Sequence, residues 1–221
     1  MRAGELERGL VSVLRAGPLV GILLLLVGGP AGAQNQKLAE RAAMSRLKGQ
    51  PNAAVTVYEI SDFQCPYCAR FSRDVFPRID SAYVKTGKAK WIFVNFPLPT
   101  HAHAWAASEA AMCAGAVSGQ FWPMHDKLFI AQAEWSAASQ PATLFAQYAK
   151  ELGVPVPAYD SCVAEDAIAT LLVRDLLNAA GAGVTGTPAF VVNNEPIFAG
   201  VRQFDEWKAI LDSAIKKAAA K

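Results

Sequence analysis

The chain has 221 residues, of which 52% are hydrophobic and 18% are charged, and its formal net charge at pH 7 is +2. This is the composition of a globular protein, and the length suits one or two domains. The nearly balanced charge gives no attraction toward nucleic acid or an acidic partner, so we expect no nucleic-acid binding.

Residues 1–33 have the pattern of a secretory signal peptide. Three arginines precede the apolar run Leu19 to Val27, and small residues then lead to an expected cleavage site after Ala33. The alternative is an uncleaved membrane anchor, although the run is shorter than the roughly 20 residues that span a bilayer. Export predicts a periplasmic or other extracytoplasmic location, where disulfides persist.

Residues 34–52 form a polar, helix-prone lead-in that ends in a turn and is too short to be a domain. Residues 53–99 then read as a βαβ unit. Val55 to Ile60 and Lys90 to Phe96 are rich in β-branched and aromatic residues, as buried strands are. Ala69 to Ile79 is expected to be a helix between them, and a right-handed crossover would make the two strands parallel.

The motif Cys65-Pro66-Tyr67-Cys68 lies where the first strand gives way to this helix. A helix N-terminus favours an anion, so Cys65 is expected to be the exposed sulfur that is a thiolate in the reduced protein and acts as the attacking cysteine. Cys68, one turn further on, is expected to resolve the mixed disulfide. Pro66 is tolerated in the first helical turn, where it stiffens the ring.

Two other uses of a CxxC motif are weaker. A structural zinc site needs two further ligands, and the sequence has no second CxxC motif and no His pair at the usual spacing, so we expect no metal. A purely structural disulfide would close too small a loop to constrain the unfolded chain. Redox chemistry is the stronger interpretation.

Glu59 is unusual in the first strand, because alternation places it on the same face as Val55 and Val57. Buried there, its carboxyl would have a raised pKa and could exchange protons with Cys68. The alternative is a glutamate at the edge of the core that points to solvent. Asp62 is expected to be a turn or capping residue.

Residues 100–182 contain no strand signal and read as a series of helices. Cys113 and Cys162 fall on different helices of this insert. In an oxidising compartment we expect them to form a structural disulfide, worth roughly 4 kcal/mol for a loop of this length, with two free buried thiols as the alternative. We expect His101, His103 and His125 to be packing or surface residues.

Residues 183–221 supply the end of the fold. After Gly186-Thr187-Pro188 come a strand at Ala189 to Val192, a hairpin turn, a partner strand at Ile197 to Ala199 and an amphipathic helix at Asp205 to Ala218. Pro188 is either an ordinary trans proline directly before a strand or a cis proline that leaves the preceding backbone free to pair with a peptide.

From Ala53 to Ala218 the chain resembles the DsbA-like thiol-disulfide oxidoreductases of bacterial cell envelopes. The CxxC motif, the Gly-Thr-Pro segment and the order of the elements carry this resemblance. It implies an α/β, thioredoxin-like fold with an inserted all-helical subdomain, and a reaction that needs no cofactor. It also implies roles for the site residues: Cys65 as nucleophile, Cys68 as resolving cysteine, Glu59 as buried acid, Pro188 as cis proline, and Thr187, Pro188, Pro66 and Tyr67 as client-binding residues. Some relatives also carry a second disulfide, as proposed for Cys113 and Cys162.

The resemblance implies an exported oxidase that introduces disulfides into reduced client proteins and is regenerated by a membrane quinone-linked partner. Tyr67 stands where the strongest oxidants have His, which suggests a milder oxidant. Thr187 resembles the corresponding residue of disulfide isomerases, but residues 34–50 cannot supply their dimerisation domain, so we expect a monomer. A disulfide isomerase or reductase, and a non-cycling metal- or client-binding module, are the alternatives.

Overall fold

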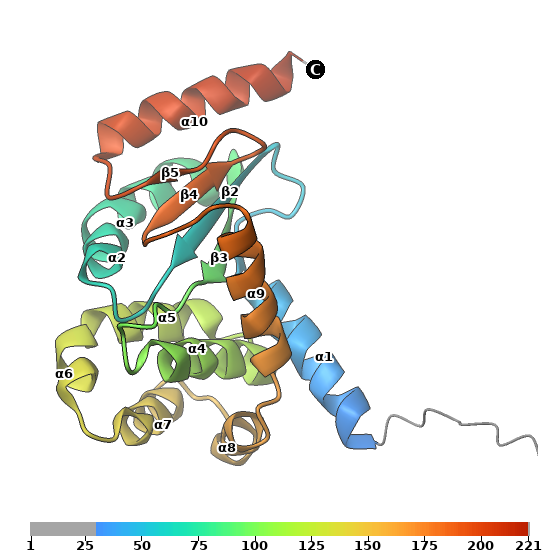
Figure 1. The fold of residues 1–221 in the computed structure, drawn as a ribbon. Helices are drawn as coiled ribbons and strands as arrows, with labels where there is room; N and C mark the ends of the chain where they lie inside the picture. Colours follow the sequence, from blue (N-terminus) through green and yellow to red (C-terminus); the bar gives the residue numbers. More distant parts are fainter. Residues whose placement is uncertain (1–29, 221) are drawn as a thin grey trace, which may run out of the picture.

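The computed structural model describes residues 30–220, which are drawn as a coloured ribbon in Figure 1. Most of the expected signal peptide, residues 1–29, lies outside the described residues, so its cleavage stays a prediction. Among the described residues, no helix is both long and apolar enough to cross a membrane.

A five-stranded mixed sheet organises one half of the molecule, with the strand order β1-β3-β2-β4-β5. The strands are β1 (Leu47–Lys48), β2 (Val55–Ser61), β3 (Ala89–Asn95), β4 (Ala189–Val192) and β5 (Phe198–Ala199). β2 and β3 are parallel, with Val57 opposite Trp91, which confirms the expected βαβ unit. β4 is antiparallel to both β2 and β5.

The segment between β2 and β3 is a continuous helical run that contains two π-helical stretches, marked η. Its parts are α2 (Pro66–Arg70), η1 (Phe71–Val75), α3 (Phe76–Ile79) and η2 (Asp80–Val84). The run begins at Pro66, three residues before the expected start at Ala69, because the first helical turn needs no N–H from a proline. Pro77 follows the first π-helical stretch, where a widened turn accommodates a ring that would clash in a regular α-helix.

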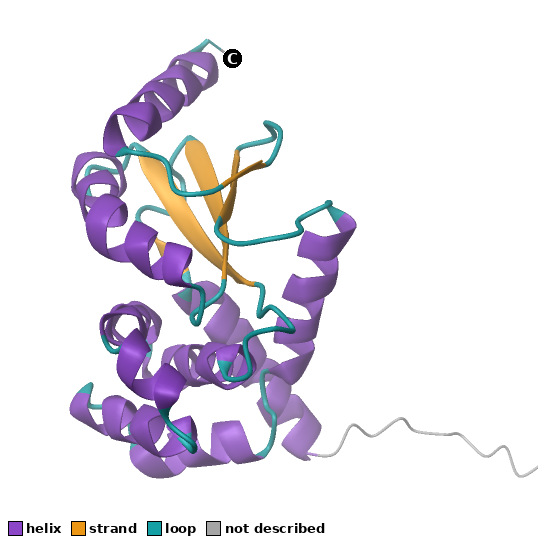
Figure 2. Cartoon of the chain, turned by 60° about the vertical axis from the view of Figure 1, so that its left-hand side comes forward, coloured by secondary structure: helices purple, strands orange, loops and turns teal. Residues whose placement is uncertain are grey.

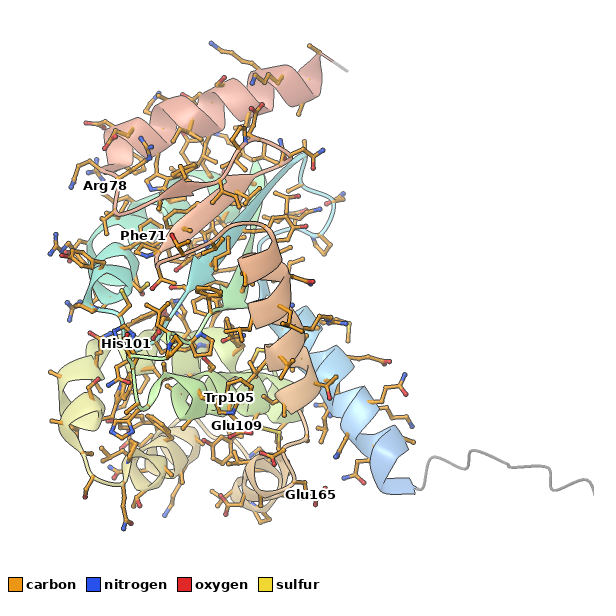
Figure 3. All side chains as sticks on the ribbon, in the orientation of Figure 1. Phe71, Arg78, His101, Trp105, Glu109 and Glu165 are labelled. Carbon is orange, nitrogen blue, oxygen red and sulfur yellow. A yellow bond between two sulfur atoms is a disulfide. The ribbon has the colours of Figure 1, made fainter. Side chains whose placement is uncertain are left out.

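Helices cover both faces of the sheet (Figures 1 and 2). The helical run and the C-terminal helix α10 (Phe204–Ala219) cover the face that carries Val57, and α9 (Ala169–Gly181) covers the face that carries Ile60. Phe71, labelled in Figure 3, packs on the first face, with its ring centroid 4.7 Å from that of Phe190 and 5.8 Å from that of Trp207.

Residues 100–182 are helical and contain no strand, as predicted. Besides α9, the helices are α4 (Ala104–Ser118), α5 (Phe121–Ile130), α6 (Gln132–Ala137), α7 (Pro141–Glu151) and α8 (Val156–Ala164). Figure 1 shows α4 to α8 gathered below the sheet. One hydrophobic core runs through both halves: the Phe63 ring centroid lies 4.8 Å from that of Phe93 in the sheet and 5.0 Å from that of Phe129 in α5.

The lead-in contributes a helix, α1 (Pro30–Ser45), and the strand β1, which the sequence did not predict. β1 pairs with β3 at the edge of the sheet, and α1 packs against α4. A Cβ atom on Gly115 of α4 would lie 2.2 Å from the Ser45 hydroxyl oxygen and 2.9 Å from the Phe121 Cβ. Gly115 therefore serves close helix packing inside α4, which continues to Ser118 and ends with Gly119 as its left-handed C-cap residue.

Candidate active site

Cys65 lies at the junction between the loop that follows β2 and the first turn of α2. It is the N-cap residue, with extended backbone angles (φ −72°, ψ 123°), and the helix begins at Pro66. Cys65 and Cys68 are unpaired thiols; Cys65 is 4% exposed and Cys68 is fully buried. The structure therefore places Cys65 as the more accessible sulfur at a helix N-terminus, where an anion is favoured.

The two thiols have opposite pKa shifts. Hydrogen bonding from the Cys68 thiol, and then from Thr187 and the backbone N–H groups of Cys68 and Tyr67, lowers the pKa of Cys65 to about 6 against the opposing effect of burial. Burial, followed by the neighbouring Cys65, raises the pKa of Cys68 well above its ordinary value. At neutral pH the reduced pair therefore carries its negative charge on Cys65, and a thiolate is the nucleophilic form.

Thr187 and Pro188 lie beside Cys65, although 122 positions separate Cys65 from Thr187 in the sequence. The Cys65 thiol donates a hydrogen bond of 3.4 Å to the Thr187 carbonyl oxygen, and the peptide bond between Thr187 and Pro188 is cis. The Thr187 hydroxyl is buried and makes no hydrogen bond within the described residues, which leaves it available to donate to a Cys65 thiolate, in keeping with its lowering of the Cys65 pKa.

Glu59 is fully buried, which rules out the alternative of a solvent-facing carboxylate. The Trp91 indole Nε1 donates a hydrogen bond of 2.7 Å to Glu59 Oε2. Burial raises the pKa of Glu59 to about 7, although hydrogen bonding from Trp91 and Ser61 opposes the rise. Ser61, which the sequence did not single out, lowers the pKa values of both Glu59 and Cys68, and its buried hydroxyl makes no hydrogen bond within the described residues.

Asp62 fixes the loop that leads to Cys65. Its buried carboxylate accepts backbone N–H bonds of 2.7 Å from Gln64 and of 2.7 Å from Leu98, in keeping with the expected turn role. His101 Nδ1 lies 2.8 Å from Asp62 Oδ2, and Figure 3 shows His101 between the sheet and the helical subdomain. No sequence spacing links Asp62 to His101, because the chain between them passes through β3.

The helical subdomain also contacts this loop through Gln132 of α6. Its side-chain nitrogen Nε2 donates hydrogen bonds of 2.7 Å to the Phe63 carbonyl oxygen and of 3.0 Å to the Cys65 carbonyl oxygen. In return, the Gln64 side-chain oxygen accepts the His103 backbone N–H at 2.7 Å. Gln132 belongs to no motif, and the sequence analysis missed it.

The two residues between the cysteines differ in their surroundings. Pro66 is the first residue of α2, and Tyr67 is 55% exposed at the surface beside the thiols. The Arg70 guanidinium carbon lies 5.3 Å from the centroid of the Tyr67 ring, so a cation stands next to this aromatic side chain. A role of Pro66 and Tyr67 in client binding stays a prediction.

Cys113 and Cys162 are joined by a disulfide that connects α4 to α8. Both residues belong to the helical subdomain, so this disulfide is separate from the Cys65 and Cys68 thiols. Within residues 30–220, no group of three or more His, Cys, Asp and Glu side chains is placed to hold a metal ion.

Several known proteins are similar to this chain in sequence. The family model described as Thioredoxin matches residues 41–213. The Na(+)/H(+) antiporter NhaA 3 of Salinispora tropica is 34% identical over 148 residues, which cover 66% of this chain but only 21% of that protein; the chain thus spans about a fifth of its length. Disulfide bond formation protein D of Bacillus subtilis is 27% identical over 180 residues, covering 77% of this chain and 79% of that protein.

Among solved structures, alpha-DsbA1 of Wolbachia pipientis has a TM-score of 0.71 at 24% identity and matches 79% of this chain and 92% of its own. The family match, the fold and the CxxC motif at the start of α2 agree. The chain therefore belongs to the thioredoxin family, as one of its DsbA-like members.

Proposed function

We propose that this DsbA-like thiol:disulfide oxidoreductase is an exported oxidase that introduces disulfide bonds into client proteins. The observation that carries the proposal is the polarised pair: Cys65, the more exposed of the two thiols, has a pKa of about 6 and lies next to a fully buried Cys68 whose pKa is raised. A low thiol pKa stabilises the reduced form of the enzyme, and an enzyme with a stable reduced form is an effective oxidant.

The cycle starts from the Cys65–Cys68 disulfide. A client thiolate attacks Cys65, the enzyme disulfide breaks, and a mixed disulfide between the client and Cys65 forms. Cys68 leaves as a thiolate and takes up a proton, for which Glu59 is the proposed donor. A second client thiolate then attacks the client sulfur and releases Cys65 as a thiolate. Two electrons pass from the client to the enzyme, which ends as the dithiol.

Glu59 suits this proton transfer because its pKa of about 7 lets it both give and accept a proton near neutral pH. Glu59 and Cys68 are both fully buried, and Ser61 lowers the pKa values of both, so the same hydroxyl acts on the proposed donor and on the proposed acceptor. In the regenerating half of the cycle the carboxylate would accept the Cys68 proton before that sulfur attacks the next oxidant.

Clients are proposed to bind across Thr187 and Pro188, with Pro66 and Tyr67 forming the other side of the site. The Thr187 carbonyl already faces Cys65 at 3.4 Å, so a client backbone paired with Thr187 would bring its own sulfur to Cys65. Exposed Tyr67 offers an aromatic surface next to the reacting sulfur. Extended, reduced segments of unfolded proteins fit such a site.

We also propose a cellular location, a regenerating partner and an oligomeric state. The apolar segment at Leu19 to Val27 supports export to the periplasm or another extracytoplasmic location, with membrane anchoring if residues 1–33 are not removed. Reoxidation needs an electron acceptor, for which we propose a membrane quinone-linked partner. We also propose that the protein acts as a monomer.

A disulfide isomerase or reductase is the second candidate. Two observations favour it: the neutral Tyr67 between the cysteines, which stabilises a thiolate less than a cation would, and Thr187 directly before Pro188. A module that binds metal or clients without redox cycling is the third. Stoichiometric zinc in the purified protein, or client oxidation that persists in Cys65→Ser, would favour this third candidate.

The reduction potential of the Cys65–Cys68 pair tests the direction of the reaction. It would be measured at equilibrium with glutathione, with the Cys113–Cys162 disulfide counted separately by mass. A value near −120 mV, about that of the strongest known oxidant of this kind, supports the oxidase. A value near −200 mV or below, roughly the range of isomerases and reductases, would overturn it in favour of the second candidate.

A further inference from the structure

Gln132 joins the helical subdomain to the redox centre. It is the first residue of α6, and its side-chain amide bonds two carbonyl oxygens of the active-site loop, those of Phe63 and Cys65, at 2.7 and 3.0 Å. An amide nitrogen carries two N–H groups, so this one nitrogen has a donor for each carbonyl.

The two carbonyls lie on either side of Gln64, directly before the helix. The Cys65 carbonyl also accepts the first helical bond, from the Ala69 N–H at 3.1 Å, and the Cys65 N–H donates to the Asp62 carbonyl at 3.1 Å. The loop is therefore held on one side by its own turn and on the other by Gln132. We propose that Gln132 is a positioning residue that keeps Cys65 at the helix start and thereby stabilises its thiolate.

Two physical effects act in the same direction. The amide donors compensate carbonyl dipoles whose negative ends would otherwise repel the nearby thiolate. They also fix the loop, so that the backbone N–H groups of Tyr67 and Cys68 stay directed toward the Cys65 sulfur. A disulfide carries no charge and needs neither effect, so Gln132 stabilises the reduced form more than the oxidised form. Its loss should make the protein a weaker oxidant.

The test compares full-length Gln132→Met with the wild type. Methionine has a similar length but no donor. Gln132→Glu is the second variant, because an ionised carboxylate has nearly the same shape and would repel both carbonyls. Gln147→Met is the matched control: Gln147 is an exposed amide on α7 that bonds Glu151 at 2.9 Å. The acid constant of Cys65 is read from the pH dependence of its alkylation, located by mass, and the redox equilibrium constant is measured against glutathione.

A net hydrogen bond contributes enough to expect a roughly two- to tenfold fall in the Cys65 acid constant for Gln132→Met. The redox equilibrium constant should shift toward the disulfide by a similar factor, Gln132→Glu should shift both further, and Gln147→Met should shift neither. A lower melting temperature with an unchanged Cys65 acid constant in both Gln132 variants would assign Gln132 a packing role and overturn the proposal.

This inference deepens the proposed function and rests on it, but the two can fail separately. If the reduction potential of the wild type lies in the range of isomerases and reductases, the oxidase proposal falls, while the difference between the wild type and Gln132→Met can still be measured. If that difference is absent and the wild type is strongly oxidising, the oxidase stands and the positioning role of Gln132 falls.

Discussion

The indole nitrogen of Trp91 on β3 donates its hydrogen to Glu59 Oε2 on β2 at 2.7 Å, inside the core. In the sheet, Trp91 is paired with Val57, and Val57 is the neighbour of Glu59 on the same face of β2. A buried carboxyl group is thus held by a neighbour that can donate one hydrogen bond but can supply no positive charge. The group therefore keeps the raised pKa that burial gives it.

Glu59→Gln should stabilise the protein at high pH. The pKa of Glu59 is raised from 4.5 to about 7, so the folded state favours the protonated acid, and its ionisation destabilises the fold increasingly as the pH rises from 4.5 to about 7. The amide introduced by this substitution would keep an acceptor for Trp91 and avoid this cost, which amounts to about 3 kcal/mol at full ionisation. Urea unfolding at pH 4 and pH 8 should show a difference from wild type only at pH 8, and an equal difference at both values would contradict the buried acid.

Cys65 should react with an alkylating reagent along a titration curve centred near pH 6, while Cys68 stays unreactive until much higher pH. The lowered pKa also has a stability consequence in the reduced protein. The Cys65 thiolate stabilises the folded state fully above pH 9.0, the ordinary pKa of a cysteine, and this stabilisation is lost as the pH falls through about 6. The stability of the reduced wild type relative to Cys65→Ala should therefore rise between pH 6 and pH 9. A flat profile, or a Cys65 titration near pH 9, would refute the polarised pair.

Gly115→Ala should destabilise the contact between α1 and α4. The added methyl group would meet the Ser45 hydroxyl oxygen at 2.2 Å and the Phe121 Cβ at 2.9 Å, and such overpacking typically costs about 1–3 kcal/mol. Gly181→Ala is the matched control, since Gly181 is also helical but has open space around it. Chemical unfolding should separate the two variants, and equal midpoints would mean that α1 does not pack on α4 as described.

Replacing both Cys113 and Cys162 with Ala should lower the free energy of unfolding by roughly 4 kcal/mol, the value expected for a cross-link that closes a loop of this length. Neither cysteine acts on the thiols at the start of α2, so the Cys65 titration should stay near pH 6. Unfolding curves and alkylation rates of the double variant test both halves of this prediction. A changed Cys65 pKa in the double variant would show that the Cys113–Cys162 disulfide influences the active site through the helical subdomain.

The strands other than β1, most of the helices and the reactive cysteines could be predicted from sequence because their signals are local. Val55 to Ile60 is rich in β-branched and aromatic residues, and the helix after the CxxC motif was predicted, although it starts at Pro66 and not at Ala69. β1 was missed because Leu47 and Lys48 have no strand signal of their own and become a strand only by pairing with β3. Gln132 was missed for a similar reason: its acceptors are backbone carbonyls, which no sequence pattern marks.

The burial of Phe63 limits how this centre can be re-engineered. The Phe63 ring, two residues before Cys65, packs between the sheet and α5, so the loop that precedes the motif is part of the shared core. A graft from another oxidoreductase that replaced Phe63 together with the CxxC motif would therefore require both halves of the molecule to repack. From Phe63 to Cys68, only Pro66 and Tyr67 are exposed to solvent, and Pro66 is tied to the first turn of α2. Within this segment, Tyr67 is therefore the position at which a substitution can change the reduction potential of the Cys65–Cys68 pair without repacking the core.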